Sequence, residues 1–164
     1  MSRIRPEDLL LPSVLDRLID EEPDNRKEVP TDRAQRLREL KLSVARDIEN
    51  LLNTRVAFGT IPENFARVRA SIVNYGVPDF NALVTDSSDT VVWMESQILE
   101  TIENFEKRLH EVSVKAEGAS RLRDVRVVKF RIEGVLQADP SPEWVKYTSQ
   151  MSAVNKQFEV KDER

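Results

Sequence analysis

The chain has 164 residues, no cysteine, one histidine and a formal net charge of −4 at pH 7. The absence of cysteine excludes disulfides and thiolate metal sites, and one histidine disfavours most other transition-metal sites, so no metal or cofactor is expected. Charges of both signs are interspersed and no apolar run reaches the roughly 18 residues that a membrane span needs, so we expect a cytoplasmic protein with no nucleic-acid partner and no direct membrane insertion.

The first predicted element is a short helix over residues 9–19. One face of it carries the apolar residues Val14, Leu15, Leu18 and Ile19, and so short a helix is marginal alone in water. This face must therefore dock on the domain or on a partner. Residues 20–30 (DEEPDNRKEVP) are charged, contain two prolines and no aromatic residue, which is typical of a linker. We divide the chain into residues 1–31, an amphipathic helix with a charged linker, and residues 32–164, an α+β domain.

Three further helices are predicted before residue 110. A capping box at Asp32 and Gln35 opens the longest one, whose apolar face carries Leu37, Leu40, Val44, Ile48 and Leu51. A shorter helix begins near Pro62 and ends at Gly76, with Phe65, Val68, Ile72 and Tyr75 spaced for one buried face. The central helix follows a cap at Asp89, and its stripe consists of Val91, Met94, Ile98, Ile102, Phe105 and Leu109.

After Arg108 the hydrophobic period changes from helical to alternating, which predicts strands. The first run places Val112, Val114 and Ala116 on one side; the second places Val128, Phe130, Ile132 and Leu136 there, with a bulge near Val127. The third alternates Val145, Tyr147, Met151 and Ala153 with Lys146, Thr148, Gln150 and Ser152. Short links between the runs favour an antiparallel meander. The expected fold is α+β, with N-terminal helices and a central helix packed on a small antiparallel sheet of about three C-terminal strands.

Residues suited to catalysis are nearly absent from the chain. His110 lies on the Val112 side of its strand, where a packing role is favoured over a catalytic one. The carboxylates Glu95, Glu100, Glu103 and Glu106 allow a glycosidase pair in principle, but their spacing is that of an ordinary helix surface. The basic run from Arg121 to Arg131 is interrupted by acidic residues and lacks interleaved aromatic residues, so a solvated face is favoured over an RNA-binding one.

Four motifs in order resemble one known family. Residues 11–23 (LPSVLDRLIDEEP), 44–55 (VARDIENLLNTR) and 73–80 (VNYGVPDF) are similar to segments of the TssE family of type VI secretion baseplate subunits, which is related to the small wedge protein of contractile phage tails. The junction Glu106-Lys107-Arg108 resembles the Glu-Pro-Arg motif of that family, with Lys107 where proline is usual.

The resemblance implies a wedge-like domain over residues 32–164 and a structural role. Members of this family join the wedge subunits TssF and TssG in the cytoplasmic baseplate, and offer a template for the contractile sheath of TssB and TssC. The family was once labelled lysozyme-like, so a glycan hydrolase of lysozyme type is the alternative. Because the chain lacks a defensible acid pair, we expect no enzymatic activity.

Three sets of residues are the predicted sites. Glu106 and Arg108, with Lys107 between them, are expected to fix the helix-to-strand junction by charge-assisted hydrogen bonds. The face of Val14, Leu15, Leu18 and Ile19 is expected to bind another wedge subunit, with docking on its own domain as the alternative. Thr148 and Gln150 are expected to mark an open sheet edge to which a sheath strand adds. The alternative there is that the charged C-terminal tail covers this edge.

Overall fold

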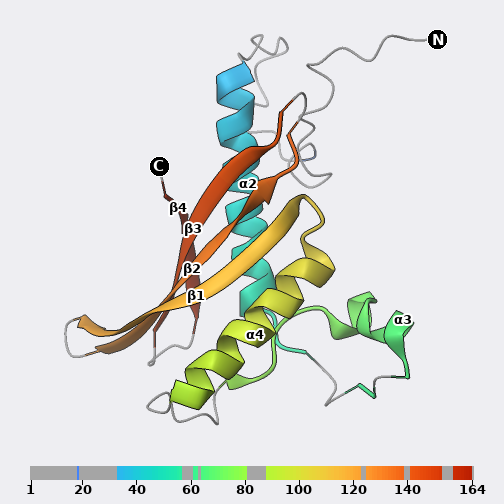
Figure 1. Ribbon diagram of the computed structural model, residues 1–164, viewed down its shortest axis with the longest axis vertical. Coiled ribbons are helices and arrows are strands. Elements are labelled where there is room, and N and C mark those ends of the chain that lie inside the picture. The colour runs from blue at the N-terminus through green and yellow to red at the C-terminus, as the bar shows by residue number, and fades with distance from the viewer. Residues whose placement is uncertain are drawn as a thin grey trace.

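A computed structural model describes Leu18 and residues 33–56, 61–62, 64–80, 88–122, 125–138, 141–152 and 157–163 (Figure 1). Its helices are α2 (Arg33–Asn53), α3 (Ala66–Arg69), the 3-10 helix η2 (Ile72–Asn74) and α4 (Ser88–Phe105). Its strands are β1 (Leu109–Leu122), β2 (Val125–Leu136), β3 (Glu143–Ser152) and β4 (Phe158–Asp162). The predicted α+β class is confirmed, since helices precede an antiparallel meander.

The sheet contains four strands, in the order β1-β2-β3-β4, rather than the three that we predicted. The additional strand is β4, which pairs antiparallel with β3 from Tyr147↔Asp162 to Met151↔Phe158. Phe158 and Val160 turn inward and are buried, while the alternate residues Glu159 and Lys161 are exposed. The segment therefore has the alternation of a strand, but it is only five residues long and charged.

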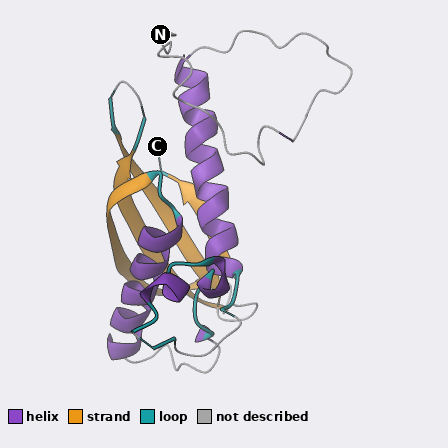
Figure 2. Ribbon diagram, turned by 90° about the vertical axis from the view of Figure 1, so that its right-hand side faces the viewer, coloured by secondary structure: helices purple, strands orange, loops and turns teal. Residues whose placement is uncertain are grey.

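Both long helices pack against the same face of the sheet. Cross-strand neighbours such as Val114, Ile132 and Tyr147 place their side chains on that face, and all three are buried. Helix α4 packs on β1, whereas α2 packs on β3 and β4, alongside the sheet in Figure 2. The predicted stripes of both helices are confirmed, because Val44, Ile48, Met94, Ile98 and Ile102 are fully buried.

The opposite face of the sheet is polar and is crossed by ion pairs. Arg131 pairs with Glu117, and Lys146 Nζ lies 3.2 Å from Glu133 Oε1 on the next strand. These cross-strand pairs agree with the solvated face that the sequence predicts for Arg131.

The predicted helix between Pro62 and Gly76 is broken into two short pieces, and its apolar face is not buried. Phe65 is exposed and Ile72 is 85% exposed. Only Tyr75 contacts the core, with its ring 5.3 Å from that of Phe105. Gly76 adopts φ +112°, so the chain turns sharply there, and a Cβ would lie 2.4 Å from the carbonyl oxygen of Thr54. The turn docks this segment on the end of α2, where the Val77 N–H donates to Thr54 O at 2.9 Å.

The bulge predicted near Val127 lies instead in β1. The β1–β2 register shifts between His110 and Ser113 and again between Ala116 and Gly118, whereas β2 pairs with β3 without a shift. Glu111 takes a positive φ of 51° at the first irregularity. This change of phase turns His110 outward, where its Nε2 lies 3.1 Å from Gln137 Oε1. The buried packing role that we predicted for His110 is therefore wrong.

Candidate functional site

The junction between α4 and β1 is a tight turn without glycine or proline. The Glu106 N–H donates to Ile102 O at 2.8 Å, which continues the helix, and the Leu109 N–H donates to Glu106 O at 3.2 Å, which closes the turn. The Gln137 N–H then donates to Arg108 O at 2.8 Å, so the turn is also fixed to the end of β2. These backbone bonds do not connect the turn to α2. Only side chains can make that connection.

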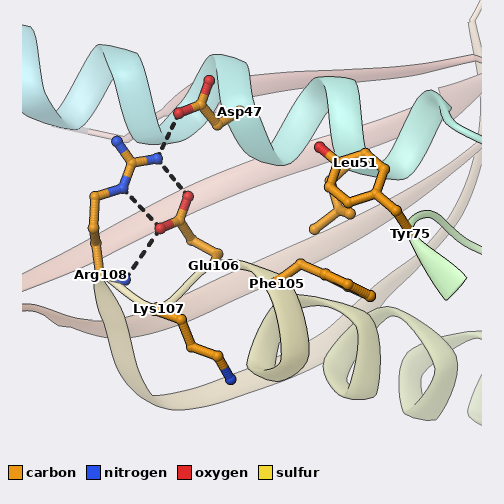
Figure 3. A pocket seen from close by; sticks show the side chains of 7 residues that line it. All are labelled: Asp47, Leu51, Tyr75, Phe105, Glu106, Lys107 and Arg108. Atoms are coloured by element: carbon orange, nitrogen blue, oxygen red, sulfur yellow. Dashed lines mark hydrogen bonds and ion pairs between the residues drawn. The ribbon is translucent and has the colours of Figure 1, made fainter. Parts of the chain in front are cut away.

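Glu106 and Arg108 supply it through a network that spans two helices (Figure 3). Glu106 is buried, with 7% of its surface exposed. Its Oε1 accepts from the backbone N–H of Arg108 at 3.1 Å and from Nε at 2.7 Å, and its Oε2 lies 2.5 Å from Nη2. The guanidinium also reaches α2, where Nη2 lies 2.6 Å from Asp47 Oδ2 and Nη1 lies 3.3 Å from Ser43 Oγ. We call these four residues the junction network.

The electrostatics of the junction network stabilise the charged form of Arg108. Hydrogen bonding to Glu106 is the largest influence on Arg108 and raises the pKa of its guanidinium, with Asp47 acting in the same direction against the opposing effect of burial. Burial foremost, and then the negative charges of Asp47 and Glu106, raise the pKa of the Tyr75 hydroxyl nearby. Bidentate pairing of this kind fixes orientation as well as charge.

A hollow of about 370 Å³ lies beside the junction network. Its apolar wall consists of Leu51, Tyr75 and Phe105, and its polar wall of Asp47, Glu106, Lys107 and Arg108 (Figure 3). A glycosidase needs one carboxylic acid and one carboxylate that can both reach the substrate. Here both carboxylates are bonded to Arg108, so the hollow does not present an acid pair.

The described residues contain neither a metal-binding cluster nor a helix that could span a membrane. Among them, no group of three or more His, Asp or Glu side chains could hold a metal ion. None of the described helices has the length and apolar character to cross a bilayer.

The structure brings Glu106 and Arg108 together but turns Lys107 away. Lys107 is exposed, and its Nζ lies 2.8 Å from Glu103 O in the last turn of α4. Sequence reasoning missed Ser43 and Asp47, the two members of the network on α2. Their spacing could have indicated that they act together, because they lie four residues apart beside the apolar stripe of the longest helix.

The edge predicted at Thr148 and Gln150 is not open. Strand β4 lies along it, with Thr148 opposite Lys161 and Gln150 opposite Glu159. The prediction that β3 is an edge strand is wrong, because the C-terminal segment covers it, which was the alternative. Of the predicted N-terminal face, Val14, Leu15 and Ile19 lie outside the described residues. Leu18 is helical and 77% exposed.

The fold and the junction network define a small α+β protein in which a buried charged cluster joins α2 to the α4–β1 junction. The sequence matches the family model described as baseplate wedge protein gp25 over residues 38–141, from α2 to the turn before β3. The chain belongs to this family, which is the one that includes TssE, so the resemblance seen in the sequence is confirmed. No curated protein and no solved structure matches the chain significantly.

Proposed function

We propose that this baseplate wedge protein is a structural subunit of a cytoplasmic type VI secretion baseplate, where it bridges TssF and TssG and templates the sheath of TssB and TssC. The observation that carries the proposal is the family match, which includes all four residues of the junction network. The charges of Asp47, Glu106 and Arg108 pair with one another between α2 and the α4–β1 junction, as a rigid connector requires.

One exposed apolar surface and one apolar face predicted from the sequence support the bridging role. One is the projecting surface of α3 and η2, formed by Phe65, Val68, Ile72 and Val73 (Figure 1). The other is the N-terminal face of Val14, Leu15, Leu18 and Ile19, of which Leu18 is exposed. Apolar patches on a charged protein mark contact surfaces for partners.

Co-purification tests the bridging role directly. TssF and TssG are expressed with the tagged chain, and Ile72→Asp is compared with Leu42→Asp, which alters an exposed leucine on α2. We expect Ile72→Asp to reduce recovery of TssF and TssG at least about tenfold, since one buried interface side chain is worth 1.4 kcal/mol or more. Deletion of residues 1–23 should also weaken recovery while the domain stays folded. Undiminished recovery with both changes would refute bridging through these surfaces.

We propose no catalytic activity, because Glu106 and Asp47 are both committed to Arg108. A peptidoglycan turnover assay on the purified chain should give the same rate as buffer. Turnover that is lost in Glu106→Gln would instead support the lysozyme-type alternative.

We also propose that a strand of a sheath subunit adds to an edge of the sheet. From the sequence we placed this edge at β3, which β4 covers, so another edge must serve. Within the described residues the sheet ends at β1 on one side and at β4 on the other. The test is binding of purified TssB–TssC to the assembled wedge, compared with binding to a wedge that lacks this chain.

A further inference from the structure

The outer face of the sheet, which is the face opposite to α2 and α4, has an aromatic side chain at one end. There Val135 of β2 lies between its partners His110 of β1 and Trp144 of β3. Trp144 is 69% exposed and Val135 is half-buried. Tryptophan is among the side chains most enriched at the energetic centre of protein interfaces. This end of the outer face therefore has the character of a contact surface.

Two lysines lie farther along the same face. Lys115 points outward from β1, opposite Arg131, and Lys129 points outward from β2, two residues before Arg131. Neither lysine has an ion-pair partner among the described residues, and nearby carboxylates are already engaged, since Glu117 pairs with Arg131 and Glu133 with a lysine of β3. This part of the face therefore carries uncompensated positive charge, although the whole chain has a net charge of −4.

The distance between these two features suits a helix that lies along the strands. Val135 marks the row of Trp144 and Arg131 the row of Lys115, and four residues of a strand span about 13 Å. A helix rises about 1.5 Å per residue, so about eight or nine of its residues cover that distance. One helix can therefore place apolar side chains over Trp144 and, about two turns farther on, carboxylates over the two lysines.

Two occupants from this chain itself fit the face poorly. A second copy would bring more lysines to it, while its Glu117 and Glu133 are paired within the copy, so like charges would be buried together. Residues 9–22 of the chain combine apolar and acidic side chains, but Leu18 of that segment is 77% exposed and is not buried on the sheet. The face thus calls for a partner that has carboxylates of its own.

We propose that the outer face of the sheet binds an acidic amphipathic helix of a wedge subunit, with apolar side chains on Trp144 and Val135 and carboxylates on Lys115 and Lys129. The inference rests on the proposed bridging role and adds a surface to it. A bridge needs two surfaces that different subunits can occupy at once. The α3–η2 surface is joined to α4 by an ion pair from α3, and α4 covers the inner face of the sheet, so it leaves the outer face free for a second subunit.

Titration with purified TssF–TssG tests the aromatic end of the face. Trp144→Ala should weaken binding at least about tenfold, as truncation of a central interface side chain does. The control is Leu42→Ala, because Leu42 is 61% exposed on α2, and it should bind as the wild type does. Both altered side chains lie on the surface, so both variants should keep the wild-type melting temperature. Equal binding by the two variants would overturn the proposal.

Charge reversal tests the other end of the face. The double variant Lys115→Glu, Lys129→Glu should bind TssF–TssG at least about tenfold more weakly than the wild type, with the largest difference at low salt. The control is the double reversal Arg38→Glu, Lys41→Glu, which changes the net charge by the same amount on α2. An equal loss in both double variants would show an effect of net charge alone and would refute a specific role of the two lysines.

Carbodiimide cross-linking of the assembled wedge identifies the occupant. This reagent joins a lysine amine directly to a carboxylate in contact with it, with loss of water and no spacer. Lys115 and Lys129 should be linked to acidic residues of one helix of a wedge subunit, with apolar residues about eight positions away along that helix. Links to a second copy of this chain, or to its own residues 20–22, would overturn the assignment of the partner.

Failure of this inference can be told apart from failure of the bridging role. If the wild-type chain does not bind TssF–TssG, the bridging role falls and the outer-face site falls with it. If the wild type binds and Ile72→Asp weakens binding, but Trp144→Ala and the lysine reversal do not, the bridging role stands and the outer-face site alone is refuted.

Discussion

Removal of the Arg108 side chain should destabilise the protein more than any other single truncation in the junction network. Arg108→Ala takes away both side-chain donors of Glu106, which is buried and retains only its bond from the backbone N–H at 3.1 Å. A carboxylate left in that position has lost its counter-ion without regaining water. Asp47 is more accessible, with 27% of its side chain exposed, so its lost bond matters less.

The expected magnitude follows from this geometry. Removal of one partner from a buried ion pair costs about 3–5 kcal/mol. The Arg108 side chain is itself 27% exposed, so water screens part of the interaction and the lower end, about 3 kcal/mol, is appropriate. For a chain of this size each kcal/mol shifts the melting temperature by about 3 °C, which predicts a loss of about 9 °C. Glu106→Gln keeps the shape and one acceptor, so we expect about half that loss.

Urea denaturation followed by fluorescence of Trp93 and Trp144 measures the free energy of unfolding. The matched control is Lys161→Ala, which breaks an ion pair of 2.8 Å with Glu159 on the exposed side of β4, and should change stability by at most about 0.5 kcal/mol. A double-mutant cycle with Glu106→Ala should give a coupling energy of about 1.5–3 kcal/mol. A surface ion pair contributes at most about 1 kcal/mol. If the free energy of unfolding of Arg108→Ala lies within that amount of the control's, the network does not hold the junction.

Three other changes probe the core and the turn in the same denaturation assay. Ser149→Ala should raise stability by about 0.5–1 kcal/mol, because the buried Ser149 hydroxyl has no hydrogen-bond partner among the described residues; a loss of stability would reveal a partner. Lys107→Pro should be neutral or stabilising by up to about 1 kcal/mol, since the three backbone bonds of the junction do not use the Lys107 N–H and proline suits the second turn position; a loss above that size would show that lysine is required. Burial raises the pKa of the Tyr147 hydroxyl, so the folded state holds a proton that the unfolded state releases. Stability should therefore fall as pH rises above about 10, and Tyr147→Phe should flatten that fall.

The long elements could be predicted from sequence because each carries its own periodic signal. Helices α2 and α4 bury the stripes that their spacing indicated, and the alternation of β2 and β3 gave the correct inward faces. Strand β4 was missed because five residues provide only two inward positions, Phe158 and Val160, between charged neighbours. The stripe of Phe65 and Ile72 was misread for a different reason: helical spacing shows that a face is apolar, but not whether this chain or another one covers it.

The junction network could be predicted only in part. Glu106 and Arg108 are close in sequence, and the change of period between them marks a turn that side chains must fix. Asp47 lies 61 residues from Arg108, and the chain has 29 acidic residues, so no local pattern selects it. Its role depends on the docking of α2 beside the junction, which is a property of the whole fold.

We expect the junction network also to influence both edges of the sheet. Helix α2 caps β4 through Glu49 and Asn53, helix α4 caps β1 through Glu95, and Arg108 is the residue whose side chain joins the end of α4 to α2. If this connection loosens, α4 can shift relative to β1, and the bond from the Ala116 N–H to Glu95 is the first edge contact to be lost. Arg108→Ala should therefore accelerate exchange of the Ala116 amide more than that of Val160, even at temperatures where the protein stays folded. Equal acceleration at both edges would show that the network contributes to global stability alone, without positioning α4.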